Sequence, residues 1–97
     1  MLKDKYKKTI LDICNKHLKD PYELFLFGSR ARGDEAFHSD IDLAIKTRNP
    51  KKDYIISLIA EDFEESTIPY KIDFLDLDQV DKKMKESIYR DGIILNG

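Results

Sequence analysis

Two apolar stretches, Leu24-Phe25-Leu26-Phe27-Gly28-Ser29 and Asp40-Ile41-Asp42-Leu43-Ala44-Ile45, determine the architecture of this chain. The run over 24–27 is typical of a strand buried on both faces, and it ends at a glycine. The run over 41–45 predicts a second apolar strand, interrupted only by an aspartate. Between them we expect a helical turn over 29–32, with Ser29 as its cap and Gly33 as its end, followed by a polar loop over 34–39.

Amphipathic helices are predicted on both sides of this pair of strands. Residues 4–18 carry apolar side chains at spacings of three and four, which is typical of a helix with one buried face, and Asp20-Pro21 ends it. Asn49-Pro50 has the form of a helix cap followed by a first-turn proline. The sequence therefore predicts a second long helix from this point to about Ser66.

The remaining residues predict a third strand and a closing helix. Residues 71–76 follow Pro69 and again carry an acid, Asp73, between apolar neighbours. We expect Asp78 to cap the last helix and Gly92 to end it, with an inner face made by Val80, Met84 and Ile88. Residues 93–95 form either a small strand or a packing segment. The alternation predicts a single α/β domain over residues 1–97, with about three core strands covered by helices.

Composition excludes several classes of protein. The 97 residues include 17 basic and 19 acidic side chains, a net charge of −2, and no long basic run, so direct binding of nucleic acid is not expected. Cys14 is the single cysteine, which leaves no disulfide framework or thiolate metal site, and it is expected in the core. No apolar run suits a leader or a membrane span, so we expect a cytoplasmic protein without membrane contact.

Three acids interrupt the apolar strands. Asp40 and Asp42 are two residues apart on extended chain, so their side chains point to the same face, and Asp73 joins them if the third strand lies beside the second. Converging carboxylates repel one another unless divalent ions lie between them. All-oxygen ligands suit Mg²⁺, and a pair of ions suits phosphoryl transfer. The alternative is that these acids lie in solvent or pair with Lys and Arg.

The Gly28-Ser29 turn is a candidate phosphate site. Glycine allows close approach of the backbone, and the N–H groups at a helix start, with the serine hydroxyl, suit phosphate oxygens. The alternative is an ordinary strand-to-helix turn, and the lysine of a P-loop is absent. Arg30 has two equally favoured roles, neutralising triphosphate charge or holding the helix. Tyr70 is expected to pack in the core rather than to line a base pocket.

Taken together, Gly28-Ser29, ten residues, and then Asp40-Ile41-Asp42 resemble the signature of the minimal nucleotidyltransferases, within the polymerase-β-like superfamily. The resemblance covers nearly the whole chain and implies a polymerase-β palm-like fold. It implies that Asp40, Asp42 and Asp73 are the catalytic residues and bind two Mg²⁺ ions. It assigns the triphosphate of ATP to Gly28 and Ser29, with Arg30 and Ser39 as further nucleotide-binding residues.

The resemblance also implies a partner. Chains of this length and pattern resemble the antitoxin of two-gene modules whose toxin is a small helical RNase of the HEPN class. The implied reaction transfers AMP from ATP to a tyrosine hydroxyl of that toxin and neutralises it within a hetero-oligomer. Relatives that modify small molecules carry an extra helical domain, for which this chain has no room. Two alternatives stay open, namely a nucleotide-binding antitoxin that acts by contact alone and nucleotidylation of a small molecule.

Overall fold

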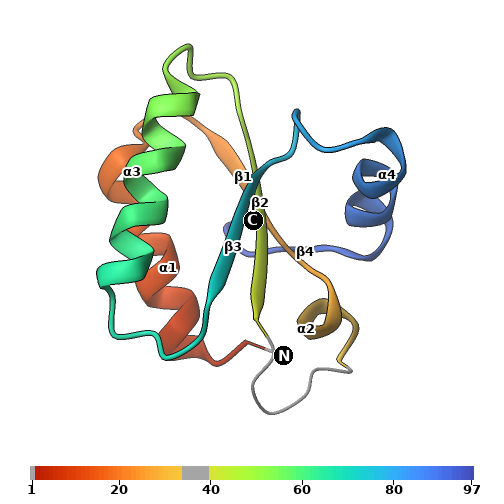
Figure 1. The fold of residues 1–97 in the computed structure, drawn as a ribbon, viewed down its shortest axis with the longest axis horizontal. Helices are drawn as coiled ribbons and strands as arrows, with labels where there is room; N and C mark the ends of the chain where they lie inside the picture. Colours follow the sequence, from red (N-terminus) through yellow and green to blue (C-terminus); the bar gives the residue numbers. More distant parts are fainter. Residues whose placement is uncertain (1, 34–39) are drawn as a thin grey trace.

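A four-stranded sheet runs through the middle of the molecule, with helices on both of its faces (Figure 1). The computed structural model describes residues 2–33 and 40–97. In chain order, the elements are α1 (Asp4–His17), β1 (Tyr22–Phe27), α2 (Ser29–Arg32), β2 (Ile41–Thr47), α3 (Lys52–Glu65), β3 (Ile72–Asp76), α4 (Lys82–Asp91) and β4 (Ile93–Ile94). The predicted α/β class is confirmed, and residues 93–94 form the small fourth strand.

The sheet has the strand order β3-β2-β1-β4. β1 and β2 are antiparallel, whereas β2 and β3 are parallel and are connected through α3. A parallel pair needs such a crossover, because the chain must return to the end of the sheet at which β2 began. The pairing of β2 with β3 places the third acid-bearing strand beside the second, which is the arrangement that the sequence analysis required.

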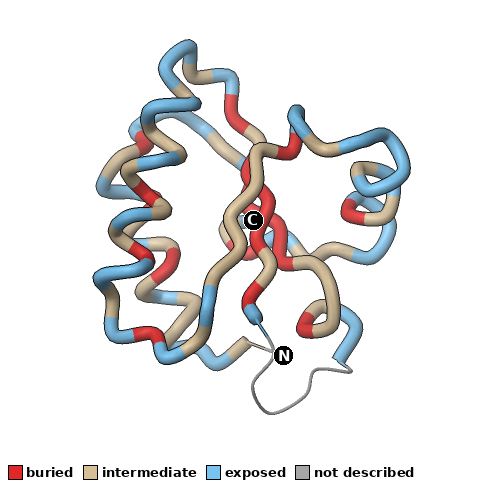
Figure 2. The backbone as a smooth tube through the Cα atoms, viewed as in Figure 1, coloured by how far each residue is buried: buried red, intermediate tan, exposed pale blue. Residues whose placement is uncertain are grey.

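The two faces of the sheet have separate cores. Helices α1 and α3 lie side by side over one face (Figure 1), where Leu24, Leu26 and Leu43 join a large buried cluster. The opposite face carries a smaller cluster that contains Phe25 and Ile88, the latter from α4. Figure 2 shows the buried segments concentrated along the central strands. Because β1 has buried side chains on both faces, it is apolar throughout, as its sequence predicted.

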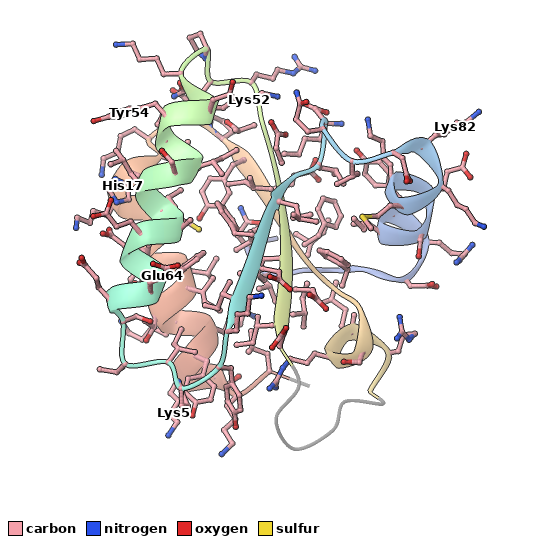
Figure 3. All side chains as sticks on the ribbon, viewed as in Figure 1. Lys5, His17, Lys52, Tyr54, Glu64 and Lys82 are labelled. Atoms are coloured by element: carbon pink, nitrogen blue, oxygen red, sulfur yellow. The ribbon has the colours of Figure 1, made fainter. Side chains whose placement is uncertain are left out.

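Two of the predicted helix starts are wrong. The cap of α4 is Asp81, whose carboxylate accepts a hydrogen bond from Met84 N at 2.7 Å. Asp78 instead pairs with Lys52 Nζ at 3.1 Å, from the first residue of α3 (labelled in Figure 3). That helix begins two residues after the predicted proline, because the Asn49 side chain accepts from Lys51 N and forms a turn before it.

Met84 was predicted on the inner face of the last helix, and this is also wrong. Met84 is 41% exposed, while Ile88, one turn later on α4, is 1% exposed and packs on the sheet. The first turn of α4 therefore stands away from the core. This leaves an apolar side chain facing the space between α4 and α2.

The single cysteine lies where its sequence position predicted. Cys14 is fully buried on α1, and burial raises the pKa of its thiol to about 12. The thiol therefore stays neutral and behaves as a small apolar side chain. Among the described residues, no helix combines the length and apolar character needed to cross a membrane.

Candidate active site

Asp42 and Asp73 are neighbours on the face of the sheet opposite α1 and α3. They are direct partners in the parallel pairing of β2 and β3. Ile41 and Leu43 point into the core beneath α1 and α3, so the alternation of side chains along β2 sends Asp42 to the opposite face. Asp40 precedes the strand by one residue and is exposed. The expectation that Asp73 lies beside the acids of the second strand is thus confirmed for Asp42, with which Asp73 is paired in the sheet.

The electrostatics of the site reflect this crowding. Partial burial raises the pKa of Asp42, the charge and hydrogen bond of Asp73 and the charge of Asp40 raise it further, and the Arg30 guanidinium opposes them. The Asp73 side chain remains 40% exposed, with Lys71 Nζ 3.6 Å from its Oδ1. These acids are therefore half-buried rather than enclosed, which leaves them accessible from solvent.

The described residues contain no group of three or more His, Cys, Asp or Glu side chains arranged to hold a metal ion. The chemistry of the donors nevertheless fits Mg²⁺. The negative charges of Asp73 and Asp40 both repel that of Asp42, and a divalent cation would offset this repulsion. The available ligands are carboxylate oxygens, which Mg²⁺ prefers. The metal-binding roles of the three acids therefore stay predictions.

The backbone of Gly28 lies close against the side chain of Asp42. It follows β1 with φ of +73°, a backbone conformation that favours glycine, and a Cβ placed on it would run into Asp42 Oδ2. The carbonyl of Gly28 accepts from the N–H groups of Ala31 and Arg32, both at 3.2 Å, and so starts α2. A glycine here thus allows the loop to close directly over the carboxylate.

Ser29 is the first residue of α2 and not its cap, which is Gly28. The prediction of a serine cap is wrong because the positive φ of the preceding residue already turns the chain into the helix. Ser29 is partly exposed beside the turn. Its role in binding phosphate stays a prediction, as does that of Ser39, which lies outside the described residues.

Arg30 is buried between three segments. The residue is 6% exposed, its Nε donates to the carbonyl oxygen of Asp40 at 3.3 Å, and its Cζ lies 4.5 Å from the centre of the Tyr70 ring. Tyr70 in turn meets the Tyr6 ring edge-on at 5.7 Å. Arg30 thus ties α2 to the start of β2, and its role toward nucleotide stays a prediction.

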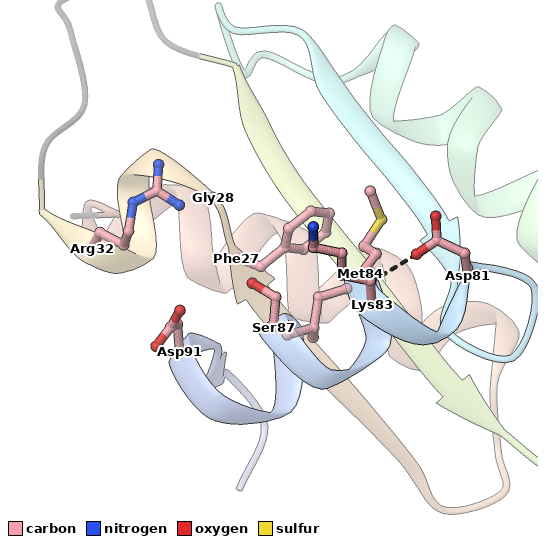
Figure 4. Close-up of a pocket in the computed structure, with 9 residues that line it drawn as sticks. Phe27, Gly28, Arg32, Asp81, Lys83, Met84, Ser87 and Asp91 are labelled. Atoms are coloured by element: carbon pink, nitrogen blue, oxygen red, sulfur yellow. Dashed lines mark hydrogen bonds between the residues drawn. The ribbon is translucent and has the colours of Figure 1, made fainter.

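A cleft between α2 and α4 adjoins Gly28, and the sequence analysis missed it (Figure 4). Its volume is about 340 Å³. It is lined by Phe27, Gly28, Arg32, Asp81, Lys83, Met84, Ser87, Ile88 and Asp91. Its walls come mainly from two helices whose nearest ends, Arg32 and Lys82, are fifty residues apart in the chain, so no local sequence pattern predicts it. No feature of the sequence indicated it, since Met84 was expected to face the core.

The chain belongs to the nucleotidyltransferase family of polymerase β. The sequence profile described as "Polymerase beta, Nucleotidyltransferase" matches residues 8–97. This membership agrees with the site, in which a glycine turn and paired acids share one face of the sheet, and the chain is accordingly a nucleotidyltransferase.

One sequence relative and two solved structures show which members of the family this chain is similar to. The chain is 32% identical over 88 residues to a Haemophilus influenzae protein described as "Probable protein adenylyltransferase MntA", covering 91% of this chain and 74% of that one. The fold of this chain is similar to that of a chain in a crystal structure of a toxin–antitoxin with AMP-PNP (TM-score 0.78, 20% identity, 94% of this chain and 73% of the other). It is also similar to a chain in the structure described as a tri-AMPylated Shewanella oneidensis HEPN toxin in complex with MNT antitoxin (TM-score 0.66, 17% identity, 99% of this chain and 73% of the other).

Proposed function

We propose that this chain is an antitoxin that acts in the cytoplasm and transfers AMP from ATP to a tyrosine hydroxyl of a small helical HEPN-type toxin. The observation that carries the proposal is the register pairing of Asp42 with Asp73 beside Gly28. The named adenylyltransferase relative and the toxin–antitoxin structures support the choice of reaction and partner.

The reaction is a displacement at the α-phosphorus of ATP. A bond forms between the acceptor's hydroxyl oxygen and the α-phosphorus, and the bond from that phosphorus to the oxygen bridging to the β-phosphate breaks. AMP stays on the acceptor, and pyrophosphate leaves with the bridging oxygen. The hydroxyl proton passes to a carboxylate oxygen of Asp73, whose side chain is 40% exposed and therefore open to an incoming acceptor.

The remaining residues bind and orient the nucleotide. Gly28 allows the backbone of the turn to approach the phosphates, and the Ser29 hydroxyl donates to a phosphate oxygen. Asp40, Asp42 and Asp73 would hold two Mg²⁺ ions, which when bound supply positive charge to the triphosphate and lower the pKa of the incoming hydroxyl. Arg30 fixes the position of the Asp40 backbone, directly before the start of β2.

Mass spectrometry of the partner tests this function. The product of the neighbouring gene is incubated with the full chain, ATP and Mg²⁺, and its mass is then measured. The proposal expects the partner's mass to rise by whole AMP units on a tyrosine. A partner that binds tightly but keeps its mass would favour neutralisation by contact alone. Transfer of AMP only to an added small hydroxylated molecule, such as an aminoglycoside, would favour the third candidate function.

A further inference from the structure

One peptide group at the start of β2 is held at both of its polar ends. The carbonyl oxygen of Asp40 accepts a hydrogen bond from Arg30 Nε at 3.3 Å. The N–H of Ile41, which belongs to the same peptide group, donates to the carbonyl oxygen of Lys71 at 2.9 Å. A peptide group is planar, so hydrogen bonds at its two ends fix its orientation. The position of the Asp40 Cα, and therefore the space that its carboxylate can reach, follows from this orientation.

Asp40 needs such contacts because it lies outside the sheet. Asp42, within β2, has a register partner on each side, Phe27 on β1 and Asp73 on β3. Both neighbouring strands therefore fix the backbone of Asp42. Asp40 lies one residue before β2 and outside these pairings. The hydrogen bond from Arg30 thus takes the place of a strand partner at this position.

Both hydrogen bonds of this peptide group depend on residues 70 and 71. Lys71 provides the acceptor for Ile41 through its own backbone. Tyr70, directly before it, contacts Arg30 through its ring, with the guanidinium Cζ 4.5 Å from the ring centre. A planar guanidinium stacks well on an aromatic ring, and the attraction is stronger where water is excluded. Arg30 is only 6% exposed, so this contact is a shielded one.

The Tyr70 ring is itself held in place by α1. It meets the Tyr6 ring edge-on, with the ring centres 5.7 Å apart and the planes at 85°. Tyr70 also packs against the core cluster beneath α1 and α3. Edge-on aromatic pairs have a defined geometry. The surface that Tyr70 presents to Arg30 therefore has a defined position and orientation.

We propose that Tyr70 is a positioning residue for AMP transfer, because its ring holds the Arg30 guanidinium against the Asp40 carbonyl and so sets where the Asp40 carboxylate lies. This assignment rests on the proposed function. It extends that function by naming a residue that acts on the site from outside, through Arg30. The competing interpretation is that Arg30 contacts the triphosphate directly and that Tyr70 contributes stability alone.

Hydrogen exchange of two backbone amides tests the positioning without any nucleotide. The N–H of Ile41 lies at one end of the β2–β3 pair, and the N–H of Leu77 donates to the carbonyl of Ile45 at 2.9 Å at the other. In Tyr70→Leu, exchange at Ile41 should be about tenfold faster than in wild type, whereas exchange at Leu77 changes by less than about threefold. A general loss of stability would instead accelerate both amides by the same factor.

Tyr89→Leu is the matched control. Tyr89, on α4, also meets an aromatic ring edge-on, that of Phe25 at 5.5 Å, and also lies beneath a cation, with Lys46 Nζ 5.6 Å from its ring centre. The same substitution there removes contacts of the same two kinds, away from the start of β2. The ratio of exchange rates at Ile41 and Leu77 should stay at its wild-type value in this variant.

Steady-state kinetics with ATP and the partner protein separate positioning from direct contact with phosphate. Tyr70→Leu should lower kcat about tenfold and change the KM for ATP by less than about twofold, because Asp40 is displaced while the Gly28 turn is kept. Tyr70→Phe keeps the ring and should restore kcat to within about twofold of wild type. Arg30→Lys keeps the charge but loses the planar guanidinium, and it should reproduce both effects of Tyr70→Leu if that variant fails to fold.

The outcomes distinguish this assignment from the proposed function. A wild-type ratio of exchange rates in Tyr70→Leu or Arg30→Lys overturns the positioning role and leaves the proposed function standing. The same holds if Tyr89→Leu alters the ratio as strongly. A raised KM for ATP at unchanged kcat also overturns it and assigns Arg30 to the phosphates. A wild-type chain that transfers no AMP to its partner contradicts the proposed function itself, and with it the positioning role.

Discussion

Asp42 on β2 lies directly opposite Asp73 on β3, so that two carboxylates face each other across a parallel pair of strands. Burial and the charge of Asp73 raise the pKa of Asp42. Like charges in this position oppose folding. An arrangement that costs stability in the folded chain is typical of a site whose purpose is to bind a positively charged ion or to move a proton.

Replacement of Asp42 by Asn should stabilise the chain in the absence of divalent cations. The substitution removes the repulsion from Asp73, and because the site is half-exposed we expect a gain of about 0.2–1 kcal/mol in the free energy of unfolding. Urea unfolding in the presence of a chelator measures it. Glu61→Gln, on the exposed surface of α3, is the control and should have no effect. A less stable Asp42→Asn protein would show that the two acids do not repel.

The same pair predicts how stability depends on pH. Since the pKa of Asp42 is raised on folding, the folded chain keeps a proton in a pH range where the unfolded chain has released it, with an unfolded pKa of about 3.9. The contribution of Asp42 to the free energy of unfolding is therefore favourable at low pH, and it is lost as the pH rises through the pKa that Asp42 has in the folded chain. The advantage in Tm of Asp42→Asn over wild type should grow between about pH 4 and pH 7. A difference in Tm between the two proteins that does not change with pH would show that the pKa of Asp42 is not raised on folding.

Gly28 and Gly33 offer a matched pair of substitutions. Both have positive φ, +73° and +80°, so alanine at either should cost about 1–2 kcal/mol of backbone strain. Only at Gly28 does the added Cβ meet Asp42, because at Gly33 none of the residues that the structure describes lies within 4 Å of the corresponding atom. We expect Gly28→Ala to lower AMP transfer about a hundredfold by displacing the carboxylate, with Gly33→Ala close to wild type in rate. Equal rates for the two variants would remove Gly28 from the site.

Tyr70 should stabilise the chain through Arg30. Tyr70→Leu removes the ring that covers the guanidinium and the edge-on contact with Tyr6, and we expect a loss of about 1–2 kcal/mol in urea unfolding. Tyr70→Phe keeps both ring contacts and should lose less than about 0.5 kcal/mol. The contact between ring and guanidinium would be unimportant if the leucine and phenylalanine variants were equally stable.

Local chemistry made the paired acids and the glycine turn predictable. The aspartate inside 41–45 interrupts an otherwise apolar strand, and a glycine that follows a buried strand marks a tight turn. The position of Asp73 required one further assumption, that the third strand pairs with the second, and the register confirms it. These features depend on residues within a strand or on one pairing of neighbours.

Features that depend on competition or on distant packing were not predictable. Asp78 and Asp81 are equally good helix caps by residue type, and the ion pair with Lys52 occupies the first of them. The exposure of Met84 follows from how α4 stands relative to α2, which no local pattern encodes. The cleft was therefore visible only once the helices were placed in space.

The rate of AMP transfer by Asp73→Asn tests the central claim most directly. Asn keeps the size of the side chain and removes the carboxylate that accepts the hydroxyl proton. With α-labelled ATP, Mg²⁺ and the partner protein, the account predicts that the initial rate falls by about 10²–10⁴ relative to wild type, while complex formation and the Glu61→Gln control are unchanged. Labelling of the partner by Asp73→Asn at the wild-type rate would contradict the account.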